Sequence, residues 1–195
     1  SGRMLHCPTK FCHEGCHVCK SLVYRAKTVE NEQSVRWNWG KKHMCRWAAY
    51  RGVPIFLEEL VTSPAHSLIE QSHCATRAKT ATNADGFGIA WYGDRREPGL
   101  YRDVMPAWSD PNLRSLVASV KSGLFLAHVR ASTGTATSRN NCHPFTFGRW
   151  SFMHNGQVGG YEAFRRDADM LIPDALYPHR KGATDSEALF LVALA

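Results

Sequence analysis

The sequence has 195 residues and a mass of 21.9 kDa, a length that suits one domain with or without a short appendage. Hydrophobic residues make up 44% and charged residues 21%, which excludes collagen-like, coiled-coil and wholly disordered chains. The formal net charge is +7, but residues 1–44 hold eight basic and three acidic side chains, so the rest of the chain is nearly neutral. Because a nucleic-acid footprint needs basic residues clustered on the folded domain, the charge does not favour a nucleic-acid partner.

The first 44 residues differ from the rest of the chain. They are rich in Cys and His, then polar and basic, and they show neither helical nor strand periodicity. These residues also lack the apolar core of a secretory signal. In the whole chain the longest apolar run, 188–195, is far shorter than the roughly 18 residues of a membrane helix. We therefore expect a cytoplasmic protein with a disordered extension at 1–44 and one domain at 45–195.

From residue 45 onward the pattern alternates between strands and helices. We expect strands at 45–50, 86–92, 99–102, 124–129 and 150–153. We expect one or two short helical turns within 56–69 and helices at 111–120, 161–170 and 185–195, with a polar loop at 133–141. Strands, a helix, further strands and further helices in this order indicate a layered α+β domain.

Four short motifs carry residue types suited to amide chemistry. They are MCRW at 44–47, HVRAST at 128–133, HNG at 154–156 and TDSE at 184–187. Each alone has an ordinary explanation, since Asn-Gly after a strand is usually a turn and Asp before Ser-Glu is a favourable helix start. A single Cys in a first strand is more often core filling than a nucleophile. The occurrence of all four in this order is what points to a function.

In this order the motifs resemble those of the class II glutamine amidotransferases, and the resemblance covers 45–195. The segments DGFGIA at 85–90 and NCHPF at 141–145 are most similar to a stand-alone branch that includes the γ-glutamyl hydrolase of ergothioneine synthesis. The resemblance implies an α+β fold, the αββα layered sandwich of the N-terminal nucleophile hydrolases. Because the chain stops inside the apolar helix 185–195, we expect a domain truncated before its last strands.

The resemblance makes Cys45 the nucleophile and the first residue of the mature chain. An amide is a poor electrophile, so its hydrolysis benefits from a covalent thioester route. The α-amino group of Cys45 would be the general base, because such a group titrates at roughly 7.7–8.0 whereas a peptide nitrogen has no basic lone pair. The side chain of Asn155 and the main-chain N–H of Gly156 would form the oxyanion hole.

The same resemblance assigns three residues to recognition of a free amino-acid head group. Arg130 would hold the α-carboxylate of the substrate in a two-pronged contact that Lys copies poorly. Thr133 adds a hydroxyl to that carboxylate, and Asp185 takes the α-ammonium. This mechanism needs no histidine. We therefore interpret the histidines beside the motifs, His128, His143 and His154, as hydrogen-bonded structural residues.

The segment 1–44 has three explanations. The true start is Met44, whose removal exposes Cys45; or 1–44 is a propeptide cleaved before Cys45; or it is retained as a metal-binding arm. Met at position 44 is what the first explanation predicts and the others do not require. Zinc sites usually pair two ligands on each side of a long loop. That arrangement is missing from the four cysteines near the start, Cys7, Cys12, Cys16 and Cys19.

The sequence therefore predicts cysteine-dependent hydrolysis of glutamine or a γ-glutamyl amide through a thioester, with release of ammonia or an amine. It predicts no cofactor and no metal, a small-molecule glutamine or γ-glutamyl substrate as partner, and no membrane association. Two alternatives stay open: a catalytically silent domain that binds a γ-glutamyl ligand, and a zinc- or nucleic-acid-binding arm at 1–44.

Overall fold

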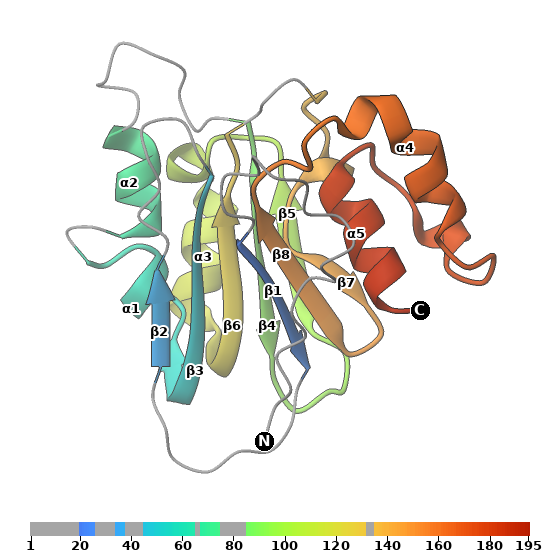
Figure 1. Cartoon of the computed structure of the whole chain (residues 1–195). Coiled ribbons are helices and arrows are strands. Elements are labelled where there is room, and N and C mark those ends of the chain that lie inside the picture. Colours follow the sequence, from blue (N-terminus) through green and yellow to red (C-terminus); the bar gives the residue numbers. More distant parts are fainter. Residues whose placement is uncertain (1–19, 26–33, 38–44, 65–66, 75–84, 132–134) are drawn as a thin grey trace.

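The strands of this chain form two antiparallel sheets (Figure 1). The structure is a computed structural model, and it describes residues 20–25, 34–37, 45–64, 67–74, 85–131 and 135–195. One sheet has the strand order β2-β3-β6-β4-β5, and the other has the order β1-β8-β7. The strands are β1 Lys20–Arg25, β2 Ser34–Trp37, β3 Arg46–Phe56, β4 Phe87–Tyr92, β5 Gly99–Asp103, β6 Lys121–Val129, β7 Phe145–Phe147 and β8 Trp150–Asn155.

Short helices lie between the strands, and the last two follow the final strand. They are α1 Glu58–Val61, α2 Leu68–Cys74, α3 Pro111–Ser119, α4 Tyr161–Met170 and α5 Asp185–Ala193, with single turns at η2 Ala107–Ser109, η3 Arg139–Asn141 and η4 Tyr177–His179. In the part of the chain that the structure describes, no helix has the length and apolarity to span a membrane. The mixed α/β content with antiparallel sheets agrees with the sequence prediction.

Helix α3 begins where the sequence predicts because its first turn is capped. The carboxylate of Asp110 accepts the main-chain N–H of Asn112 at 2.7 Å and of Leu113 at 3.1 Å, which satisfies two donors that lack a partner within the helix. Pro111 fits the first helical position because it has no N–H to satisfy there. Leu113 and Val117 are buried on the face turned toward the five-stranded sheet.

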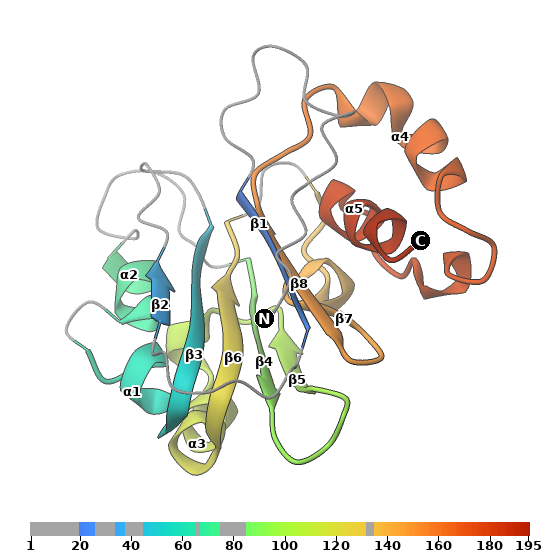
Figure 2. The same cartoon turned by 60° about the horizontal axis from the view of Figure 1, so that its bottom comes forward.

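Alternation along β3 places side chains on both faces of the five-stranded sheet. Tyr50 packs in the core that this sheet shares with α1, α2 and α3, whereas Trp47 packs with Met153 of the second sheet. Beyond the second sheet, the ring of Phe190 in α5 stacks on Phe152 of β8 at 5.4 Å. Figures 1 and 2 accordingly show α1, α2 and α3 on one side of the paired sheets and α4 and α5 on the other. Each large apolar side chain buried in these layers contributes about 1.5–3 kcal/mol.

Several strands differ in extent from the sequence prediction, β3 and β7 among them. The sequence predicts that the first strand ends at residue 50, but β3 continues to Phe56 through a shift of register between Arg51 and Ile55. The sequence there contains Gly52 and Pro54, which favour a turn, and only the pairing with β6 keeps the chain extended. Strand β7, at Phe145–Phe147, is absent from the prediction because three residues are too short to show alternation.

Ten residues within 1–44 form strands, which differs from the disordered extension that the sequence predicts. Strand β1 pairs with β8, with Lys20 opposite Asn155, and β2 pairs with β3, with Trp37 opposite Ala48. Edge strands present unpaired N–H and C=O groups that any extended segment can meet. Such pairing depends on the rest of the fold, so the short segments alone do not reveal it. The cysteine cluster at 7–19 lies outside the described residues.

Candidate active site

Cys45 immediately precedes β3 and lies beside the end of β6. Arg46 faces Val129 in the register of these strands, so Cys45 stands next to the residues that follow β6. Its Sγ accepts the main-chain N–H of Ala131 at 3.2 Å and lies 3.4 Å from the carbonyl oxygen of that residue. Burial raises the pKa of the Cys45 thiol, and the Ala131 contact and the charge of Arg130 oppose that rise only in part. Among the described residues, no side-chain base hydrogen bonds to this thiol.

Asn155, the last residue of β8, reaches Cys45 from the second sheet. Its side-chain Nδ2 donates to the main-chain carbonyl of Cys45 at 3.0 Å, and the Asn155 side chain is buried. An amide nitrogen carries two N–H donors, so this contact uses one of them. Gly156 follows directly and is exposed. The structure therefore brings together Cys45 and Asn155, and Gly156 follows Asn155 in the chain.

Arg130 is buried beside Cys45, and its guanidinium is fixed by neighbouring oxygens. Nη2 donates to the hydroxyl of Thr135 at 2.6 Å, and Nη1 donates to the carbonyl of Asp85 at 3.3 Å. The main-chain N–H of Arg130 donates to Gly86 at 2.8 Å, which continues the pairing of β6 with the chain before β4. Thr133, the predicted assistant of Arg130, lies outside the described residues. The sequence analysis did not predict the contact of Thr135 with Arg130. The run rich in Thr and Ser at 132–138 was the only feature of the sequence that could have indicated it.

Close packing explains the two glycines at the start of β4. Gly86 has a φ of +106°, a conformation that L side chains rarely adopt, and a Cβ there would lie 2.6 Å from the Sγ of Cys142. A Cβ on Gly88 would meet the main-chain carbonyl oxygen of His143. The chain before β4 can therefore approach both Arg130 and the loop after β6.

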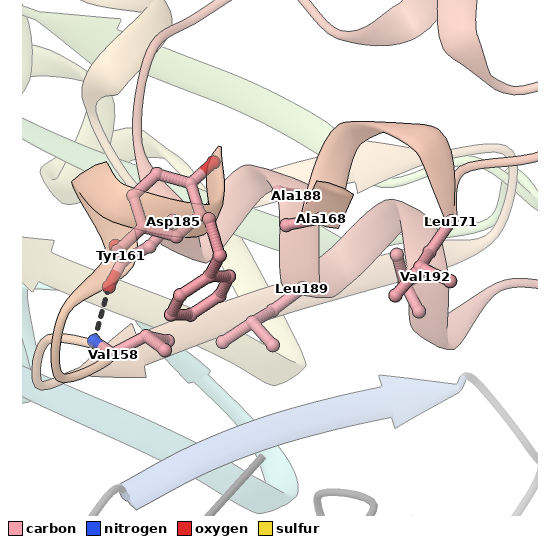
Figure 3. A pocket seen from close by; sticks show the side chains of 9 residues that line it. Val158, Tyr161, Ala168, Leu171, Asp185, Ala188, Leu189 and Val192 are labelled. Atoms are coloured by element: carbon pink, nitrogen blue, oxygen red, sulfur yellow. Dashed lines mark hydrogen bonds between the residues drawn. The ribbon is translucent and has the colours of Figure 1, made fainter. Parts of the chain in front are cut away.

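The carboxylate of Asp185, at the start of α5, contacts the loop that follows β8. Its Oδ2 accepts the main-chain N–H of Val158 at 2.6 Å, the dashed contact in Figure 3. Its Oδ1 accepts the main-chain N–H of Ser186 at 2.7 Å. Val158 is three residues beyond Asn155, so Asp185 lies against the loop that carries Gly156. The half-buried carboxylate thereby joins the C-terminal helix to the neighbourhood of Cys45.

A small apolar cavity lies between α4 and α5, and Asp185 is one of its lining residues (Figure 3). Phe164 of α4 and Leu189 of α5 are among its walls. Its volume is about 20 Å³, whereas pockets that bind small molecules usually hold about 300–1,000 Å³. The cavity is therefore a packing gap between two helices and does not accommodate an amino-acid substrate.

Three histidines near these motifs are almost completely buried. Burial lowers the pKa of His128 to about 3 and holds the pKa of His143 well below its usual value, and their rings lie 4.5 Å apart. Burial also lowers the pKa of His154, whose Nδ1 lies 2.8 Å from the hydroxyl of Ser186. Within the described residues, only His154 matches the interpretation of a hydrogen-bonded histidine, because His128 and His143 have no such partner there. Burial therefore favours the neutral form of each of the three rings.

Glu187 and Asn141, to which the sequence analysis assigned no individual role, fix the loop before α5. Glu187 accepts Nη1 of the buried Arg180 and the main-chain N–H of Gly182, each at 2.7 Å. The buried Asn141 accepts the main-chain N–H of Ala183 at 2.8 Å with its Oδ1. Its Nδ2 donates at 2.9 Å to the loop that contacts Arg130. The contact between Asn141 and Ala183 joins residues 42 positions apart that only the fold brings together. The contacts of Glu187 depend on the path of the loop that precedes α5.

The described residues contain no group of three or more His, Cys, Asp or Glu side chains arranged to hold a metal ion. The cysteines of the alternative zinc arm, at 7–19, are not among them.

Comparison with known proteins identifies the relatives of this chain. The sequence model of the class-II glutamine amidotransferases matches residues 59–195. The chain is 40% identical over 160 residues to the probable glutamine amidotransferase DUG3 of Saccharomyces cerevisiae, a match that covers 77% of this chain and 45% of that protein. It is 35% identical over 117 residues to the γ-glutamyl-hercynylcysteine sulfoxide hydrolase of Mycolicibacterium smegmatis, covering 59% of this chain and 52% of that protein.

A solved structure is also similar. It is that of a glutamine aminotransferase class-II domain protein from Silicibacter pomeroyi, with 54% sequence identity and a TM-score of 0.57. The match covers 76% of this chain and 53% of that one. The chain thus spans about half the length of the relatives it matches.

Proposed function

Because the chain belongs to the class II glutamine amidotransferases, we propose that it hydrolyses the γ-amide bond of glutamine or of a γ-glutamyl compound through a thioester on Cys45. One observation carries the proposal: the Asn155 amide donates to Cys45 at 3.0 Å, which unites an oxyanion donor and a thiol from residues 110 positions apart. The M. smegmatis relative is named for a γ-glutamyl substrate, which supports a glutamyl head group for this chain as well.

The reaction has two steps. The Cys45 sulfur attacks the amide carbon, the carbon–nitrogen bond breaks, and ammonia or an amine leaves with the proton taken from the thiol. Water then attacks the thioester, the carbon–sulfur bond breaks, and the product is glutamate with a regenerated thiol. Splitting one difficult step into two easier ones is the advantage of covalent catalysis.

The thiol needs a base, because burial raises its pKa and keeps it protonated at neutral pH. An α-amino group on Cys45 itself would supply that base, since it titrates at roughly 7.7–8.0. The catalytic form therefore begins at Cys45, whether the residues before it are removed from a precursor or are never made. The alternative of a retained metal-binding arm leaves Cys45 without this base.

Negative charge develops on the amide oxygen during attack. The second N–H of the Asn155 side chain and the main-chain N–H of Gly156 donate hydrogen bonds to that oxygen. The loss of one such donor typically raises the activation barrier by about 3 kcal/mol. The burial of Asn155 and its anchor on Cys45 support this role, because a fixed donor needs no reorganisation during the reaction.

The α-carboxylate of the substrate binds Arg130 with help from Thr133, and its α-ammonium binds Asp185. The fixed guanidinium beside Cys45 and the carboxylate beside the Gly156 loop support this assignment. Opposite charges at two ends of one site select a free amino-acid head group. We also assign the stacking of helices and paired sheets to the αββα sandwich of the N-terminal nucleophile hydrolases.

The test compares forms that differ only at the N-terminus and at Cys45. The full coding sequence is expressed, intact mass gives the first residue, and glutamate release is measured for the 1–195 form, the form that begins at Cys45, and Cys45→Ala. We expect release only from the form with an N-terminal Cys45. Cys142→Ala is the matched control, because Cys142 is a buried thiol with no assigned role, and it should retain release.

Two outcomes would contradict the proposal. Equal glutamate release by all forms, Cys45→Ala included, would exclude the thioester mechanism. Calorimetric binding of a γ-glutamyl ligand without turnover, in protein shown to begin at Cys45, would instead identify a silent binding domain.

A further inference from the structure

The first turn of α5 is bonded to the chain on both sides of Asn155. Asp185 accepts the N–H of Val158, after Asn155, at 2.6 Å. Ser186 contacts Nδ1 of His154, immediately before Asn155, at 2.8 Å. The helix therefore holds the end of β8 at two points, with the proposed oxyanion donor between them.

We propose that Ser186 is a positioning residue for Asn155, acting through its hydrogen bond with the ring of His154. The inference rests on the proposed function, because Asn155 matters only if it serves as the oxyanion donor. Ser186 and His154 are both buried, so water does not compete for their hydrogen bond.

The direction of the hydrogen bond between His154 and Ser186 follows from the contact of Ser186 with the carboxylate of Asp185. A carboxylate has no proton to give at neutral pH, so the Ser186 hydroxyl donates to Oδ1 of Asp185, 3.2 Å away. The Nδ1 of the neutral His154 then carries the proton and donates to the Ser186 oxygen. The resulting series of hydrogen bonds runs from the strand of Asn155 to the carboxylate proposed to bind the substrate ammonium.

Alternation explains how a bond to His154 can orient Asn155. Successive side chains of a strand point to opposite faces. His154 therefore turns toward α5 while Asn155 turns toward Cys45 on the other sheet. Rotation of the strand end about its own axis would move both side chains together, so fixing His154 fixes the direction of Asn155.

Strand pairing at the end of β8 differs between the full chain and a form that begins at Cys45. Pairing with β7 covers only the residues from Trp150 to Phe152. Pairing with β1 reaches Asn155, opposite Lys20, but a catalytic form that begins at Cys45 lacks β1. In that form the hydrogen bond with Ser186 still ties His154 to α5, which makes Ser186 more important there than in the full chain.

The test uses the form that shows Cys45-dependent glutamate release. We expect Ser186→Ala to lower kcat at least tenfold with KM within twofold, and Ser186→Thr, which retains the hydroxyl, to recover kcat to within threefold of the parent. Ser72→Ala is the matched control: the Ser72 hydroxyl is also buried and donates within α2 at 2.6 Å. We expect that variant to keep the parental kcat.

A second readout does not depend on activity. In the 195-residue chain, the side-chain amide NMR signals of Asn155, assigned with Asn155→Ala, should shift in Ser186→Ala and stay in place in Ser72→Ala. If the parent shows no Cys45-dependent turnover but these signals shift, the proposed function fails and the positioning role stands.

The inference is overturned if folded Ser186→Ala keeps kcat within twofold, if Ser72→Ala loses as much, or if Ser186→Thr recovers nothing. If Ser186→Ala does not fold, two substitutions of His154 decide. The amide of His154→Asn can replace Nδ1 as a hydrogen-bond partner, so its kcat should exceed that of His154→Leu at least tenfold. Equal kcat values for these two would refute the role of the hydrogen bond.

Discussion

Replacing Asn155 by Ala separates the two tasks that the structure gives this side chain. One N–H of its amide anchors the strand end to the carbonyl of Cys45 at 3.0 Å, and the other is assigned to the developing oxyanion. Ala removes both donors without adding charge or bulk. The substitution therefore changes the barrier of the reaction and the stability of the fold by separate amounts.

The two magnitudes follow from the two hydrogen bonds that Ala cannot make. Loss of one oxyanion donor lowers kcat by about 10²–10³-fold. Loss of the single hydrogen bond to Cys45 lowers the free energy of unfolding by about 1 kcal/mol, with the upper end near 2 because the carbonyl loses its partner. KM should stay within about threefold, because the substrate head group is assigned to Arg130 and Asp185.

Steady-state glutamate release of the active form measures kcat and KM, and urea unfolding measures the stability. The control is Asn112→Ala, an exposed Asn in the first turn of α3 on the far side of the five-stranded sheet. It should leave kcat unchanged. A folded Asn155→Ala that keeps more than one tenth of the parental kcat would refute the oxyanion role, and a rise in KM alone would move Asn155 to substrate binding.

Three further predictions concern contacts elsewhere in the fold, two of them with a matched control variant. Arg180→Met breaks a buried ion pair and should lower the free energy of unfolding by about 3 kcal/mol, whereas Arg139→Met breaks an equally short but exposed pair and should cost less than about 1 kcal/mol in urea unfolding. Gly88→Ala forces a Cβ against main chain and should lower the free energy of unfolding by at least about 2 kcal/mol, which is seen as a lower melting temperature. Gly159→Ala places its Cβ in open space and should leave the melting temperature nearly unchanged. Burial lowers the pKa of His128 to about 3 from 6.5, so between these pH values the unfolded chain binds a proton that the folded chain excludes. Stability should therefore fall by about 1.4 kcal/mol per unit below pH 6.5 from this residue, and His128→Gln should show a shallower pH dependence; an identical slope would contradict the reasoning.

Local chemistry made much of this fold predictable. The cap of α3 by Asp110 and the apolar runs of the strands at 86–92 and 124–129 involve neighbours in sequence, and the structure has these elements near the predicted bounds. The family was also predicted correctly, from the order of four motifs, and the match over 59–195 confirms it.

The partners of those motif residues were not predictable. Thr135, at 2.6 Å from Arg130, looks in sequence like the other small polar residues of its loop. Strands in 1–44 were missed because their pairing depends on sheet edges supplied by β3 and β8. The roles of Glu187 and Arg180 were missed because a buried ion pair is invisible until burial is known.

The sequence by itself determined which chemical groups this protein has and in what order they occur, since a thiol, an amide and a guanidinium are fixed by residue type. Only the tertiary structure decided that Cys45 meets Ala131, 86 residues away, and Asn155, 110 residues away. Strand register and sheet packing set those distances, and both depend on the free energy of the whole domain rather than on any local segment.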